Sequence, residues 1–235
     1  MSKTIRPPFK IHGGKYYLSS WIISNFPKQH QKYDYMESHV GAGSVLLNKK
    51  VSEGIEAIND VDLGVVQIFR ALRDEPGHFT GRIKRTKYCE NTFNKAWNRK
   101  EEKFKDYMDH AVNEYILRRM SRGGLKNNFA WSDRSRGGQP GDVNAWKTMA
   151  EQLPLIAERI KKIHIFNKGF LEVIKAFNDS NMLLYCDPTY LPSTRITTTA
   201  YEYEMSTDDH IHLAEALNQF KGKVLCRSIF LENPD

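Results

Sequence analysis

The sequence of 235 residues contains no apolar run near the ~20 residues that a membrane-spanning helix needs. Its first eight residues, Met1 to Pro8, lack the apolar core of a secretory signal. The three cysteines, Cys89, Cys186 and Cys226, are odd in number and far apart, which excludes a disulfide framework and a zinc cluster. These absences predict a cytoplasmic protein with reduced thiols, no bound metal and no membrane partner.

The composition is that of a globular protein. Hydrophobic residues make up 40% of the chain and charged residues 27%, which excludes a collagen-like, low-complexity or disordered chain. The length suits one large domain or two small ones.

The net charge of +7 is concentrated in one part of the chain. Residues 78–141 contain 15 Lys and Arg against 7 Asp and Glu, whereas the remainder contains 20 basic and 21 acidic residues. A concentrated basic segment is what a polyanion-binding surface requires, because each neutralised phosphate releases a counterion. A solvated, lysine-rich helical surface is the alternative, and charge alone does not decide between the two.

The first part of the sequence alternates between strand and helix patterns. Residues 33–40 predict a strand that ends at Gly41-Ala42-Gly43, and residues 44–50 predict a helix. Residues 56–58 predict a second strand, which ends at Asn59-Asp60. This order is typical of a nucleotide-binding βαβ half. Further helices are expected at residues 15–26, 65–72, 110–120, 145–162, 171–177 and from 207, and further strands at 163–166, 182–186 and 223–226.

Two segments of this half predict a nucleoside-containing cofactor. Glycines that follow a strand let the backbone approach a ligand closely, and Gly41-x-Gly43 lacks the third glycine of a dinucleotide site. Asp60 lies 17 residues after Gly43, where a carboxylate accepts hydrogen bonds from ribose hydroxyls. Lys15 belongs to a basic turn, His12 to Lys15, that either holds an anionic group or is an ordinary turn.

A third segment, Asp187-Pro188-Thr189-Tyr190, follows the apolar run of residues 182–186. Ligands in open α/β sheets lie at such strand ends. The carboxylate of Asp187 and the carbonyl of Pro188 suit the two N–H groups of an exocyclic amine, and the ring of Tyr190 suits stacking on a flipped base. An acidic turn with a packing tyrosine is the alternative.

The basic middle of the chain has no regular period after its helix at residues 110–120. Residues 121–138 interleave glycine, arginine and aromatic residues. This composition predicts a loop-rich recognition region.

Taken in order, these motifs resemble the Dam-type DNA adenine-N6 methyltransferase family. That family runs from a Gly-Gly-Lys, through a Glu-Pro-Phe-x-Gly-x-Gly loop, an acidic strand end and a recognition insertion, to Asp-Pro-Pro-Tyr. Here the corresponding segments are Gly13 to Lys15, Glu37 to Gly43, Asp60, the basic insertion and Asp187 to Tyr190. Residues 117–125 resemble its insertion motif in a phage-like variant, and residues 191–195 and 201–205 resemble its post-catalytic loop.

The resemblance implies an α/β fold with a Rossmann-like methyltransferase sheet and an inserted, mostly helical DNA-recognition domain. Residues 1–75 and 160–235 would form the catalytic domain, and residues 76–159 the insertion. The implied activity is methyl transfer from S-adenosylmethionine to N6 of a flipped adenine in double-stranded DNA, in a bacterial or phage-infected cell. A role in restriction-modification is part of this expectation.

The resemblance also implies site residues. For the cofactor they are Lys15, Glu37, Gly41, Gly43, Asp60, Phe170 and Asp187; for the target base Asp187, Pro188 and Tyr190; and for DNA Arg118, Arg119, Arg122, Lys126 and Arg134.

The sequence departs from the family at three places. Ser38-His39 replaces Pro-Phe, Thr189 replaces the second proline, and after Cys226 the chain has Arg227 in place of Ser-Gly-Tyr and stops at Asp235. An impaired relative that binds DNA or cofactor is therefore the main alternative to an active enzyme. A methyltransferase acting on RNA or on cytosine N4 is the third hypothesis.

Overall fold

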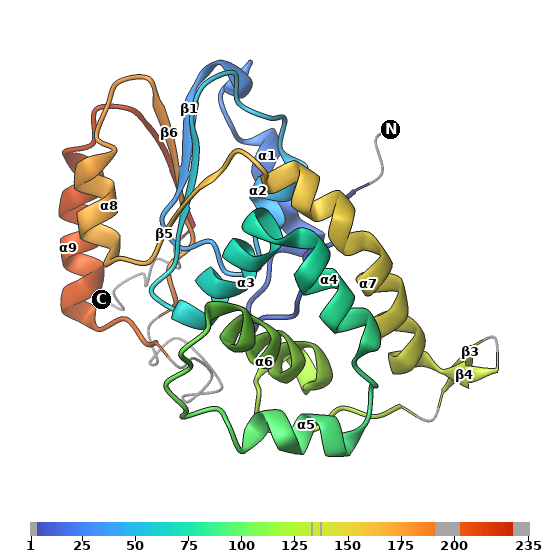
Figure 1. The fold of residues 1–235 in the computed structure, drawn as a ribbon. Helices are drawn as coiled ribbons and strands as arrows, with labels where there is room; N and C mark the ends of the chain where they lie inside the picture. Colours follow the sequence, from blue (N-terminus) through green and yellow to red (C-terminus); the bar gives the residue numbers. More distant parts are fainter. Residues whose placement is uncertain (1–3, 133, 137, 191–202, 228–235) are drawn as a thin grey trace, which may run out of the picture. The chain divides into compact units, whose positions relative to one another are not determined.

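The structure, a computed structural model, describes residues 4–132, 134–136, 138–190 and 203–227. The chain forms two compact units (Figure 1). The helical unit comprises residues 1–16, 41–47 and 63–162, and the sheet unit comprises residues 17–40, 48–62 and 163–235. These boundaries differ from the predicted division into residues 1–75 plus 160–235 and an insertion at 76–159, whose role as a recognition domain stays a prediction.

The sheet unit contains a parallel sheet of five strands in the order β5-β2-β1-β6-β7. The chain moves outward from β1 through β2 to β5, then returns to the other side of β1 to form β6 and β7. The crossing direction therefore reverses between β1 and β6, and ligands in open α/β sheets bind beside such a reversal. The strands are β1 (Asp34–Glu37), β2 (Glu56–Asn59), β5 (His164–Phe166), β6 (Met182–Cys186) and β7 (Lys223–Cys226).

The sheet is covered on both faces, which explains its apolar strands. All five residues of β6 and all four of β2 are buried, as expected for central strands of a parallel sheet. On one face, α8 (Phe170–Ala176) and α9 (Thr207–Asn218) pack through Val173 and Leu213 against a core that includes Leu184 of β6 (Figure 1). The predicted α/β fold with a parallel sheet is confirmed.

The other face of the sheet is packed by residues that follow α1 (Ser19–Ser24). Phe26 lies against Tyr35 and Tyr185, with ring centroids 5.9 and 6.2 Å apart. The helix predicted over residues 15–26 is thus shorter than expected, and a 3-10 turn at Tyr16–Leu18 precedes it. A second 3-10 turn, His30–Lys32, leads into β1.

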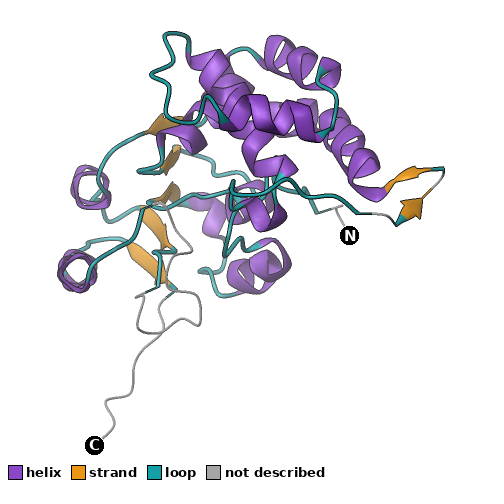
Figure 2. Cartoon of the chain, turned by 90° about the horizontal axis from the view of Figure 1, so that it is seen from below, coloured by secondary structure: helices purple, strands orange, loops and turns teal. Residues whose placement is uncertain are grey.

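The helical unit is built around α6, which is buried along most of its length. Gly64 of α3 allows close packing against α6, because a Cβ there would lie 2.6 Å or less from the Glu114 side chain. The short β3–β4 hairpin extends from the start of α7 in both views (Figure 1 and Figure 2). The elements are α2 (Ser44–Asn48), α3 (Leu63–Asp74), α4 (Pro76–Arg85), α5 (Glu90–Trp97), α6 (Tyr107–Met120), a 3-10 turn (Arg122–Gly124), β3 (Ser135–Arg136), β4 (Gln139–Pro140) and α7 (Gly141–Ile160).

No helix in the described parts of the chain has the length and apolarity needed to span a membrane. The three cysteines are free thiols, and Cys186 is buried in β6.

Candidate active site

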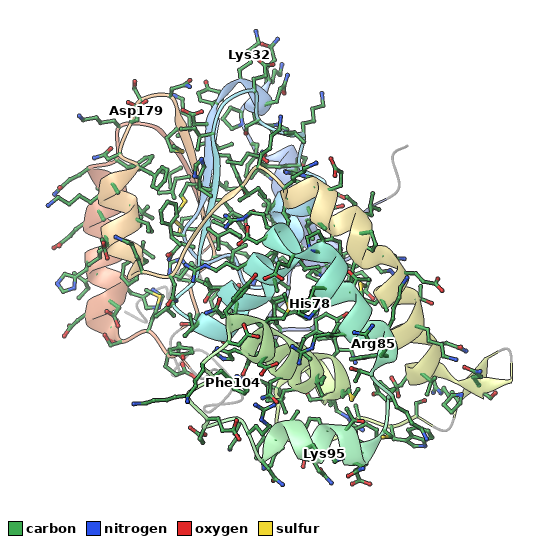
Figure 3. All side chains as sticks on the ribbon, in the orientation of Figure 1. Lys32, His78, Arg85, Lys95, Phe104 and Asp179 are labelled. Atoms are coloured by element: carbon green, nitrogen blue, oxygen red, sulfur yellow. The ribbon has the colours of Figure 1, made fainter. Side chains whose placement is uncertain are left out.

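The candidate site lies at the carboxyl edge of the parallel sheet. Lys32 and Asp179, which precede β1 and β6, mark the opposite, amino edge at the top of Figure 3. The residues that leave the strands at the carboxyl edge are Ser38 after β1, Asp60 after β2, Asn167 after β5, Asp187 after β6 and Arg227 after β7. Five polar or charged side chains from five strands therefore follow the same edge of one sheet.

Glu37, the last residue of β1, is oriented by a group of buried polar side chains that begins with Tyr35. The phenol of Tyr35 donates a 2.6 Å hydrogen bond to Glu37 Oε1, and burial raises the pKa of Tyr35 well above its usual value, which keeps the phenol protonated. The ammonium of Lys49 lies 4.2 Å from the centroid of the Tyr35 ring and forms a buried ion pair with Glu56. Because all of these groups are buried, the carboxylate of Glu37 has a defined orientation.

Ser38 and His39 occupy the place where the resembling family has proline and phenylalanine. Ser38 Oγ donates to Cys186 Sγ at 3.1 Å and lies 2.9 Å from His39 Nδ1. The imidazole ring of His39 packs against Phe170 with centroids 5.5 Å apart and planes 31° apart. Burial, with a smaller effect from His210, lowers the pKa of His39 to about 4. A neutral aromatic ring therefore still occupies this position at neutral pH.

The loops after β1, β2 and β5 are joined by Asn59, a residue that sequence reasoning missed. Its buried amide donates to the carbonyls of Ser38 and Lys168, both at 3.0 Å, and accepts from the Lys168 N–H at 2.9 Å. The one feature of the sequence that could have pointed to it is a polar residue at the end of an apolar strand pattern. Asn59 therefore fixes the position of the backbone directly before Asp60.

Asp60 has a defined carboxylate direction. Its Oδ1 accepts the backbone N–H of Asp62 at 3.0 Å, and its own carbonyl accepts a 2.8 Å hydrogen bond from the side chain of Asn167. Asp60 thus lies beside Asn167 at the end of β5, and Phe170 at the start of α8 follows Asn167 by three residues.

The segment after β6 leaves the sheet between β1 and β7. Ser38 donates its backbone N–H to the Tyr185 carbonyl at 3.2 Å, and Arg227 donates its own to the Cys186 carbonyl at 2.9 Å. Pro188 is buried, whereas Asp187 and Tyr190 are partly exposed. The guanidinium of Arg227 lies 5.8 Å from the centroid of the Tyr190 ring, within the range of a cation–π contact. Burial raises the pKa of Tyr190.

Lys15, Gly41 and Gly43 belong to the helical unit. The two glycines have φ of +52° and +71°, a backbone region that other residues rarely adopt, so the loop conformation itself requires glycine, and the close approach of a ligand stays a prediction. Lys15 donates its ammonium to the Gly13 carbonyl at 2.6 Å.

The five basic residues predicted to bind DNA have different surroundings. Arg118 is buried and pairs with Glu114 at 3.2 Å, and Lys126 pairs with the same carboxylate at 3.3 Å. Arg119 is partly buried and donates to the Ala145 carbonyl at 3.0 Å.

Arg122 and Arg134 are exposed, as is Trp131, whose side chain is 51% exposed. Arg85 and Lys95 add charge on α4 and α5 (Figure 3). Arg122 and Arg134 are thus the two predicted DNA residues that present their charge to solvent, while Arg118 and Lys126 help to hold the turn after α6.

Comparison with known protein families matches residues 12–234 to the D12 class N6 adenine-specific DNA methyltransferases. The match covers nearly the whole chain. The chain belongs to this family. No curated protein matches the sequence.

The protein is therefore an adenine-specific DNA methyltransferase that transfers a methyl group to N6 of adenine in DNA, as predicted. The family decides against cytosine N4 and RNA as targets, and nothing in the described residues favours the alternative of an impaired relative. A methyl donor and a DNA substrate follow from the activity. The resembling segment at residues 191–195 and the start of that at 201–205 lie outside the described residues.

Proposed function

We propose that the carboxyl edge of the sheet binds S-adenosylmethionine and a flipped target adenine, and that Asp187 and Pro188 hold the amine during transfer. The observation that carries this proposal is the reversal of the chain between β1 and β6. The candidate cofactor residue Glu37 and the candidate amine-binding residue Asp187 lie at adjacent strand ends, with Glu37 opposite Tyr185 in the register. Such a reversal is where open α/β sheets bind their ligands.

The residues on the β1 side fit the methyl donor. The fixed carboxylate of Asp60 suits the ribose hydroxyls, and the partly exposed ring of Phe170, which packs beside His39, suits contact with the adenine. Glu37 is a further hydrogen-bond acceptor of the sheet unit for the cofactor, while Gly41 and Gly43 of the helical unit stay cofactor candidates from the sequence. When bound, S-adenosylmethionine supplies a methyl group on a positively charged sulfur, which makes it a strong electrophile.

The residues on the β6 side fit an exocyclic amine. The carboxylate of Asp187 and the carbonyl of Pro188 accept the two N–H bonds, which directs the nitrogen lone pair away from the ring. Tyr190 stacks on the base and is itself held by Arg227. Most of the rate enhancement then comes from orientation and electrostatics, and the methylated nitrogen afterwards gives up its extra proton to the Asp187 carboxylate or to water.

Radioactive methyl transfer tests this proposal. The wild type is incubated with tritiated S-adenosylmethionine and unmethylated DNA, and the modified base is identified. Asp187→Ala is expected to lose transfer by at least about 100-fold while binding of cofactor and DNA stays largely in place, because its contacts matter mainly in the transition state. Glu151→Ala, an exposed acid on α7, is the matched control. Full transfer by Asp187→Ala would exclude the assigned amine site.

A further inference from the structure

The loop of Asp187 to Tyr190 is tied to the start of α9 through Thr189. Thr189 Oγ1 accepts the backbone N–H of Met205 at 3.1 Å. The carbonyl of Thr189 lies 2.9 Å from His210 Nε2. Because a carbonyl only accepts, His210 donates this second hydrogen bond from a protonated Nε2. Thr189 is therefore held both by its side chain and by its backbone.

The start of α9 is a rigid point of attachment. Ser206 and Asp209 form a capping box: Ser206 Oγ accepts the Asp209 N–H at 3.1 Å, and Asp209 Oδ2 accepts the Ser206 N–H at 2.9 Å. Met205 and Leu213 are buried in the same core as Leu184 of β6. The helix that holds Thr189 is thus fixed to the strand that ends just before Asp187.

These contacts are made at position 189, where the chain has threonine in place of the second proline of the family motif. A proline at position 189 would restrict the backbone of Pro188 to extended conformations, and threonine imposes no such restriction. The two hydrogen bonds reach Thr189 from residues that lie 16 and 21 positions away in the sequence. They hold Thr189, the residue that directly follows the Pro188 carbonyl assigned to the substrate amine and directly precedes Tyr190.

We propose that Thr189 and His210 are positioning residues that hold the Pro188 carbonyl and the Tyr190 ring in place for the target adenine, in the role that the second proline has in the family motif. This inference rests on the proposed function of the Asp187–Tyr190 loop. Thr189 suits the role because its hydroxyl oxygen accepts the Met205 N–H, which neither valine nor proline can do.

Steady-state kinetics of the full chain test the proposal. Thr189→Val keeps the shape of the side chain and removes the acceptor, so it is expected to lower kcat about 5- to 30-fold while the KM for S-adenosylmethionine changes less than twofold. Thr189→Ser keeps the acceptor and is expected to retain most of kcat. His210→Phe is expected to resemble Thr189→Val, and His210→Gln, whose amide can donate, to recover part of the loss.

Matched controls lie on the same helix. Thr207→Val and His212→Phe make the same chemical changes at exposed positions of α9 and are expected to leave kcat within about twofold of wild type. Thr189→Pro gives up the hydroxyl and gains the backbone constraint, so it is expected to retain more activity than Thr189→Val. Hydrogen exchange at the Met205 amide, faster in Thr189→Val than in Thr189→Ser, reports the contact itself without any methyl transfer.

The outcomes distinguish a failure of the proposed function from a failure of the positioning role alone. A wild type that transfers no methyl group overturns the proposed function and the positioning role together. An active wild type whose kcat is unchanged in Thr189→Val and His210→Phe overturns the positioning role alone. Equal losses in Thr189→Val and Thr189→Ser, or a Thr189→Pro variant less active than Thr189→Val, also overturn it.

Discussion

His39 makes the stability of the protein depend on pH in a predictable window. Its native pKa is about 4, because burial disfavours the charged imidazole, against 6.5 for an unperturbed histidine. Between these two values the unfolded chain binds a proton that the folded chain does not, so the unfolded state gains stability as the pH falls. The stabilising contribution of the neutral ring is therefore complete above pH 6.5 and is lost as the pH falls toward 4.

The size of this effect follows from the two pKa values. Each unit of difference corresponds to about 1.36 kcal/mol, which gives about 3 kcal/mol over the whole window and about 2 kcal/mol between pH 7.5 and pH 5. His39→Phe replaces the imidazole by a ring that does not titrate. Between pH 7.5 and pH 5 the free energy of unfolding of the wild type is thus expected to fall by about 2 kcal/mol more than that of the variant.

Urea unfolding of both proteins at pH 7.5 and pH 5 measures the difference. Burial also lowers the pKa of His30, but this residue is present in both proteins and its effect cancels in the comparison. Equal losses of stability in the wild type and His39→Phe would refute the assignment of a buried, neutral imidazole beside Phe170.

Three further predictions concern the cofactor, the DNA and the buried polar side chains that orient Glu37. Asp60→Ala should weaken binding of S-adenosylmethionine by about 1.5–3 kcal/mol, the scale of hydrogen bonds to a charged group, and unchanged affinity in calorimetry would remove the ribose assignment. Replacing Arg122 and Arg134 by Gln should make the slope of log affinity for DNA against log salt shallower by about 1.8, since each phosphate contact contributes about 0.9; an unchanged slope would place DNA elsewhere. Lys49→Met should destabilise the fold by about 3–5 kcal/mol because Glu56 remains buried and charged, and the double variant with Glu56→Gln should recover more than half of this in denaturant titrations.

The sequence predicted the strand Met182–Cys186 with the observed bounds, because a strand that is buried on both faces forms a continuous apolar run. The bounds expected for Lys223–Cys226 also agree with the structure, although this edge strand is partly exposed. Ends of other elements moved by a few residues. The helix expected at residues 145–162 begins at Gly141 and continues through Pro154. Pattern reasoning thus located the strand ends that carry Asp60 and Asp187.

The local charge count was a poorer guide to individual side chains. It describes the segment as a whole, and it treated Arg118 and Lys126 as equivalent to Arg122. In the structure Glu114 pairs with Arg118 one helical turn away and with Lys126 beyond the helix end. The sequence does not show that one carboxylate pairs with two basic residues, because Lys126 reaches Glu114 only through the turn after α6. Net charge therefore indicates the class of binding partner, whereas burial determines which basic side chains are exposed to bind it.

Departures from a motif can be read from sequence, but what offsets them cannot. The substitution at position 189 removes a constraint that acts between neighbours in the chain, and this loss was evident from two adjacent residues. The contacts that hold Thr189 come from Met205 and His210, which reach it only because α9 packs on the strand that ends before Asp187. A similar argument applies to His39, where burial against Phe170 turns a titratable residue into a neutral aromatic ring. In both places tertiary packing holds a residue that departs from the motif, so we expect activity to depend on α8 and α9 as well as on the motif residues.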